Sequence, residues 1–156
     1  MAERAHAVHL NIDATMKLFA HDETVEEVKD ALVAASGLDR LPLLLELAWF
    51  LRQRDCKQTE LFAEEAQALL QQASVSPEQR RAGLARLILV RAEICLMFAE
   101  LAQATALAKE ALQKFEALQD DVGMGDALWL EASLGVDRGD GVGQLRVIAV
   151  TRAGRP

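Results

Sequence analysis

The apolar residues of this chain recur at the spacing of an α-helix over most of its length. Between residues 104 and 118 they follow a three-four period, with most charged and amide side chains on the other face. Residues 84–98 are apolar almost all round, which predicts a central helix packed between neighbours. Along the whole chain the pattern predicts seven helices, at about residues 8–20, 24–36, 40–54, 58–73, 77–98, 101–119 and 122–138.

Local signals mark some of the helix ends. Ser76 is followed by Pro77 and, at the third position, by Gln79, which predicts a capped helix start. Thr24 and Glu27 have the same capping spacing, and Gly37 can take the left-handed conformation that ends a helix. Strand signals are scarce, with a β-branched run only at residues 147–150. The chain is therefore predicted to be all-α.

The predicted helices also repeat. When Ala48, Ala92 and Ala132 are superposed as equivalent points on three first helices, the spacings are 44 and 40 residues. In the first two units a second helix follows, with small residues at matching places: Ala63 and Ala66 in one, Ala108 and Ala111 in the other. Small residues at these places let the two helices of a unit approach closely.

This arrangement resembles the tetratricopeptide repeat (TPR) family. In the best unit, residues 84–118, Ala92, Ala104 and Ala111 fall at the small-residue positions of the family, whereas Cys95 and Ala108 stand where large aromatic residues are usual. The resemblance implies antiparallel helical hairpins stacked as a TPR-like α-solenoid. Because the spacings exceed the usual repeat length, another α-solenoid or a plain helical bundle is the alternative.

Three regions follow from this assignment. Residues 1–38 are expected to form an N-terminal helical hairpin or cap, residues 39–139 the TPR-like repeats, and residues 140–156 an irregular tail. The third unit has a first helix but no recognisable second one, which truncation, a shifted reading frame or a natural strand-like tail would explain. Leu128, Leu130 and Leu134 would then form an exposed apolar surface, and we expect a homodimer through this C-terminal repeat.

A second resemblance concerns residues 111–130. The pattern Ala-Leu-x-x-Phe-x-x-Leu-x-Asp-Asp-x-Gly at Ala111 to Gly123 is similar to repeat regions that precede output domains in bacterial signalling proteins, such as diguanylate cyclases and transcription regulators. The active-site motif of the cyclases is absent, so no cyclase residue can be transferred to this chain. A sensory or dimerisation segment of such a protein is therefore the alternative function.

Composition and charge narrow the class of partner. The chain has 156 residues, of which 51% are hydrophobic, and a net charge of -7, as expected of one globular domain. Neither a spanning stretch nor a signal peptide is present, so we expect a cytoplasmic protein without membrane contact. Residues 1–137 carry a net charge of -10 and residues 138–156 one of +3. The acidic body argues against nucleic acid and favours a basic peptide.

The sequence offers no convincing catalytic, metal or cofactor site. His6 and His9 share a helical spacing, but nothing nearby completes a zinc ligand set. His21 precedes two acidic residues, and this group is more plausibly a polar turn before a helix than a catalytic acid–base pair. Cys56 and Cys95 lack a redox spacing and are expected to be reduced and buried. We therefore expect a protein that is not an enzyme and needs no cofactor.

The TPR resemblance implies a concave binding face lined by first-helix residues. It predicts a non-enzymatic protein-protein interaction module that binds a peptide or helix on this face. Tryptophan and arginine are frequent among the residues that contribute most binding energy, and the alternative is that both tryptophans are core or end-packing residues. The candidate peptide-binding residues are Trp49, Arg52, Arg86, Glu93, Met97 and Trp129.

Overall fold

A computed structural model describes residues 19–137, and within this range the chain is all-helical, without strands. The six α-helices correspond to the last six predicted from the sequence, with ends that differ by a few residues. Of the first predicted helix, residues 8–18 lie outside the described range and Phe19 and Ala20 are not helical. The tail, 140–156, also lies outside it. The helices are α1 (Asp22–Ala34), α2 (Arg40–Leu51), α3 (Cys56–Leu70), α4 (Pro77–Met97), α5 (Leu101–Leu118) and α6 (Asp121–Asp137), with a 3-10 turn at Gly37–Asp39.

The helix ends test the capping signals. At the start of α4 the Ser76 hydroxyl accepts a hydrogen bond from the Gln79 amide, and the Gln79 side chain accepts one from the Ser76 amide, which confirms the predicted capping box. The second predicted box is wrong, because α1 begins at Asp22 and Thr24 lies inside it. Acidic residues in the first turn favour this earlier start, since they face the positive end of the helix dipole. Gly37 is left-handed, as predicted, but α1 already ends at Ala34.

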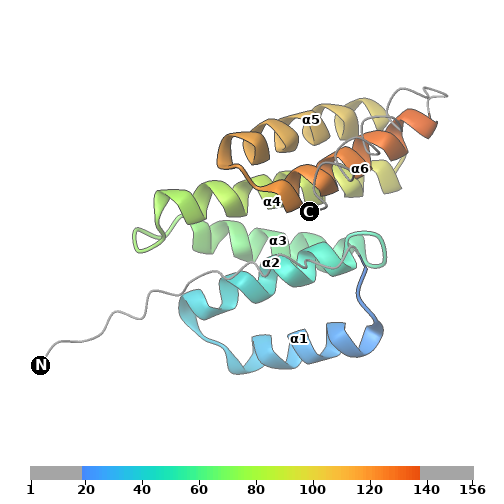
Figure 1. Cartoon of the computed structure of the whole chain (residues 1–156). Coiled ribbons are helices and arrows are strands. Elements are labelled where there is room, and N and C mark those ends of the chain that lie inside the picture. Colours follow the sequence, from blue (N-terminus) through green and yellow to red (C-terminus); the bar gives the residue numbers. More distant parts are fainter. Residues whose placement is uncertain (1–18, 138–156) are drawn as a thin grey trace, which may run out of the picture.

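Short turns join α2 to α3, α4 to α5 and α5 to α6, so these consecutive helices run antiparallel (Figure 1). The helix α1 packs against α2, and α1 and α5 lie at opposite ends of the molecule with α2, α3 and α4 between them. The helix α4 contacts α2, α3, α5 and α6, which confirms the prediction that this segment is central. Because α2 contacts α4 and α4 contacts α6, three helices that do not follow one another in sequence lie side by side.

Small residues lie in the helix contacts. Ala48, Ala92 and Ala132, the three points superposed in the repeat, are all buried. The buried alanines of α5 are Ala104, Ala108 and Ala111. Alanine lets helix axes approach closely because its side chain is a single methyl group. The expected exposure of the leucines on α6 is wrong, since Leu128, Leu130 and Leu134 are all buried in the core.

Replacing Ala111 with leucine is expected to lower the free energy of unfolding by about 1 to 3 kcal/mol. Ala111 is fully buried, so the larger side chain must displace its neighbours. Thermal unfolding followed by circular dichroism measures the effect. Ala106→Leu, at an exposed position of the same helix, is the matched control, and an equal midpoint for the two variants would contradict the prediction.

Within the described residues, no helix is both long and apolar enough to cross a membrane. Cys56 and Cys95 are both free thiols. Cys95 is buried as expected, whereas Cys56 is only partly buried at the first position of α3.

Candidate functional site

The structure brings four of the six candidate binding residues together and leaves two apart at the surface. Trp49 lies on α2 and Arg52 directly after its end, and Arg86 and Glu93 lie on α4. All four are buried, and the Trp49 side chain is 0% exposed. In contrast, Met97 at the end of α4 is 50% exposed and Trp129 on α6 is 45% exposed. The assignment of these residues to a binding groove stays a prediction.

Two ion pairs join the three neighbouring helices. The Arg52 Nε atom lies 3.3 Å from the Glu93 Oε1 atom, which links the end of α2 to α4. The Arg86 Nη1 atom donates a 2.6 Å hydrogen bond to the Asp126 Oδ2 atom, which links α4 to α6. Gln53 also donates to Glu93, at 2.8 Å. We call Arg52, Glu93, Arg86 and Asp126 the charged cluster.

Aromatic rings alternate with the two guanidinium groups of the charged cluster. The guanidinium carbon of Arg52 lies 3.6 Å from the Trp49 ring centre, and that of Arg86 lies 4.7 Å from it. Beyond Arg86 follows the Phe115 ring, at 5.1 Å, and beyond Arg52 the Phe19 ring, at 5.7 Å. Each contact is within the range of a cation–π attraction, which is stronger where water is excluded. We call these five side chains, Phe19, Arg52, Trp49, Arg86 and Phe115, the stack. The stack connects the segment before α1 with α2, α4 and α5.

Burial changes the ionisation of this cluster. Burial lowers the pKa of the Arg52 guanidinium from its ordinary value, and the neighbouring Glu93 carboxylate opposes that effect. Burial also raises the pKa of the Asp126 carboxyl, against the opposing effect of Arg86. Buried charges are costly to desolvate and are retained only when paired. The cluster therefore holds α2, α4 and α6 in one arrangement, since a shift of any of these helices would separate a buried pair.

One polar group of the site is left without a partner. Among the described residues, nothing accepts a hydrogen bond from the buried indole Nε1 of Trp49. Such groups are rare in folded proteins.

Sequence reasoning missed two members of the stack. The apolar period predicts only that Phe115 lies on the apolar face of its helix, and it places Phe19 in a helix that the structure does not form there. Asp126, in contrast, carries a signal, since it lies 40 residues after Arg86, which equals the second spacing between superposed alanines. A repeat spacing that joins opposite charges could have identified this pair.

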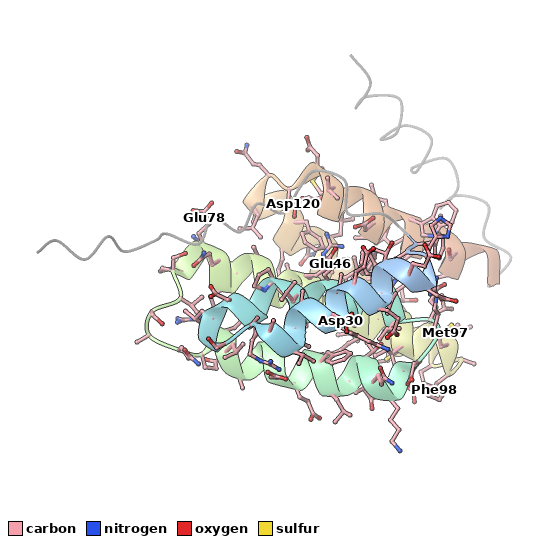
Figure 2. The ribbon with its side chains drawn as sticks, turned by 90° about the horizontal axis from the view of Figure 1, so that it is seen from below. Asp30, Glu46, Glu78, Met97, Phe98 and Asp120 are labelled. Carbon is pink, nitrogen blue, oxygen red and sulfur yellow. The ribbon has the colours of Figure 1, made fainter. Side chains whose placement is uncertain are left out.

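The exposed candidates lie outside the stack. Met97 and the neighbouring Phe98 lie together at one end of the molecule, far from Glu78 at the start of the same helix (Figure 2). Both are exposed, as is Trp129 on the adjoining helix α6. Single exposed apolar side chains are normal at a protein surface, whereas tryptophan is enriched among the residues that anchor protein contacts.

Two observations bear on metal and pocket chemistry in the described residues. Residues 19–137 contain no group of three or more histidine, cysteine or acidic side chains that could hold a metal ion. A surface cavity of about 410 Å³ lies between the start of α4 and the end of α5. The residues that line it are Glu78, Arg81, Leu84, Lys114, Ala117 and Leu118.

Replacing Glu46 with glutamine is expected to stabilise the protein at neutral pH by up to about 1 kcal/mol, the effect being limited by solvent screening. Burial raises the pKa of the Glu46 carboxyl above its ordinary value of 4.5, so the ionised form is disfavoured in the folded state. Below that value the carboxyl is neutral in both states and the cost disappears, whereas it develops as the pH rises through the raised pKa.

Urea unfolding of the wild type and Glu46→Gln at about pH 4 and pH 7 measures this difference. Glu64→Gln, at an exposed position of α3, should change stability at neither pH. A larger advantage for the variant at the lower pH would show that the sign is wrong.

Comparison with known proteins returned no match: no protein-family model, no curated protein and no solved structure shows significant similarity to this chain.

Proposed function

We propose that this chain is a non-enzymatic, TPR-like helical-repeat module that binds a segment of another protein on the face formed by α2, α4 and α6. The side-by-side contact of these three helices supports a stacked arrangement of hairpins. The buried alanines at the equivalent positions of the three helices support the repeat register. A protein of this kind acts by presenting a fixed surface, and the charged cluster holds that surface in place.

The exposure of Trp129 is the observation that carries the proposal. Trp129 stands three residues before Ala132, as Leu45 and Leu89 stand before Ala48 and Ala92. The two leucines are buried, whereas the indole is half-exposed on a helix that contacts α4. A tryptophan combines a large apolar area with a polar group, so its exposure on such a face is typical of a binding anchor. The acidic body favours a basic partner segment.

A phage-displayed peptide library panned against the full chain tests this proposal. Trp129→Ala and Met97→Ala should each weaken a selected peptide at least about tenfold, as for anchors of an interface. Leu61→Ala and Val33→Ala, at exposed apolar positions of α3 and α1, are the matched controls. No enrichment of peptides, or equal loss with the controls, would refute binding on this face.

The same residue favours the alternative, a dimerising or sensory segment of a bacterial signalling protein. An exposed tryptophan on the last described helix can pack against a second copy of itself. We expect sedimentation velocity to show a monomer–dimer equilibrium that Trp129→Ala shifts towards the monomer. A strict monomer at high concentration would exclude dimerisation through the third unit.

A further inference from the structure

The first residue of α1 and the three residues before it are held by the α2–α3 turn in the manner of a bound peptide. Arg54 donates hydrogen bonds to the backbone carbonyl of Ala20 and, at 2.8 Å, to the carboxylate of Asp22. The Phe19 ring lies over the Arg52 guanidinium. Two arginines at the α2–α3 turn therefore contact residues 19–22. Arg54 binds a backbone carbonyl and a carboxylate of this segment, and Arg52 contacts its aromatic ring.

The burial of these residues separates the tightly fitted position from the loosely held ones. Ala20 is only 3% exposed, so the site accepts a small side chain there. Phe19, on the other hand, is 57% exposed and the Asp22 side chain is almost fully exposed. The core contacts of α1 come instead from Val25 and Leu32. The contacts of Phe19 and Asp22 therefore add little to the packing of α1.

We propose that the α2–α3 turn is a docking site for a short segment with the pattern aromatic–small–any–acidic, which Phe19–Asp22 occupies in the free protein. A partner segment of this chemistry binds by displacing it. This inference rests on the proposed function, a module that binds segments of other proteins, and it adds a second docking place, at which Arg54 selects a segment with an acidic position. Phe19 contacts Arg52, a residue of the charged cluster. Replacement of the internal segment by a partner segment therefore changes a contact of the cluster that holds α2, α4 and α6.

Of the two hydrogen bonds that Arg54 makes to the internal segment, the one to Asp22 is exposed, whereas the one to the Ala20 carbonyl is part-buried. An ion pair between exposed side chains is screened by water and salt and holds its partners weakly. Chain connectivity favours the internal segment over a free peptide, since a tethered segment competes at an effective concentration on the order of millimolar. A free peptide is therefore expected to bind the wild type weakly and to bind tightly once the internal segment is weakened.

Fluorescence anisotropy with the labelled peptide KLFAHDET, which copies residues 17–24, tests the proposal on the full chain. The receptor is the double variant Phe19→Ala/Asp22→Ala, whose altered side chains are both exposed and should not prevent folding. We expect saturable binding at least about tenfold tighter than to the wild type. Adding Arg54→Ala to this receptor should abolish binding, as should alanine in place of the peptide phenylalanine.

Two controls isolate the site. Arg91→Ala removes another exposed arginine that bonds to a side chain of α3, and Phe98→Ala removes another exposed phenylalanine. Neither substitution, added to the same receptor, should change the affinity for the peptide. Circular dichroism should show the same helix content in every variant.

The proposal is overturned if the folded double variant does not bind the peptide saturably, or if Arg54→Ala leaves the affinity unchanged. Equal affinity of the wild type and the double variant would also overturn it, because no internal competition would exist. If peptides selected from a library still bind through Trp129 and Met97, the docking site fails while the proposed function stands. If no peptide binds at either place, both fail.

Discussion

Replacing Glu93 with alanine is expected to lower the free energy of unfolding by about 3 to 5 kcal/mol, the range for breaking one half of a buried ion pair. The substitution leaves the Arg52 guanidinium buried without its carboxylate, and it removes the acceptor of the Gln53 amide. Urea unfolding followed by far-ultraviolet circular dichroism measures this loss. Tryptophan fluorescence is a poorer reporter here, because the substitution alters the surroundings of Trp49.

Two further variants identify the cause. Glu110→Ala removes an exposed carboxylate that lies 3.8 Å from Lys114, and it should change stability by no more than about 0.5 kcal/mol. Replacing both partners, as Arg52→Met with Glu93→Leu, should restore much of the stability lost in Glu93→Ala, since no buried charge then remains unpaired. If Glu93→Ala and Glu110→Ala have equal effects, the pair between α2 and α4 is not a buried ion pair.

Replacing Gly123 with alanine is expected to lower the free energy of unfolding by about 3 kcal/mol, because the added methyl group overpacks the core. A methyl group on Gly123 would overlap the Phe115 ring, well inside van der Waals contact. The ring cannot easily move away, because it is buried in the core and lies against the Arg86 guanidinium. Thermal unfolding should show a lowered midpoint.

The neighbouring glycine of the same helix provides the control. A methyl group on Gly125 meets nothing within 4 Å, so Gly125→Ala should stabilise α6 by about 0.5 to 1 kcal/mol through helix propensity. Phe115→Leu combined with Gly123→Ala should recover part of the loss by making room. Similar midpoints for Gly123→Ala and Gly125→Ala would contradict the close contact between α5 and α6.

The all-helical fold was predictable because its signals are local. The three-four apolar spacing and the Ser76-Pro77 start depend only on residues within a few turns of each other, and the structure confirms both. The start of α1 was misplaced because two local signals competed. The Thr24 capping pattern lies two residues beyond Asp22, whose charge favours an earlier first turn.

The site was predictable only in part, because its contacts join residues distant in sequence. The repeat register placed Trp49, Arg52, Arg86 and Glu93 on one face, but it could not show that these four side chains are buried around paired charges. Burial there depends on how closely three helices approach, which the sequence pattern of a single helix does not contain. Phe19 joined the stack for the same reason, through an arginine 33 residues further along the chain.

The two ion pairs also restrict how this protein can change in length. Glu93 belongs to the hairpin of α4 and α5, and it is paired with the preceding hairpin through Arg52, while Arg86 of the same hairpin is paired with α6. Insertion of another hairpin between α3 and α4 would separate Arg52 from Glu93. Deletion of the hairpin α4–α5 would remove the ion-pair partners of both Arg52 and Asp126. Gene duplication or loss of a unit here thus requires simultaneous replacement of the charges on both sides.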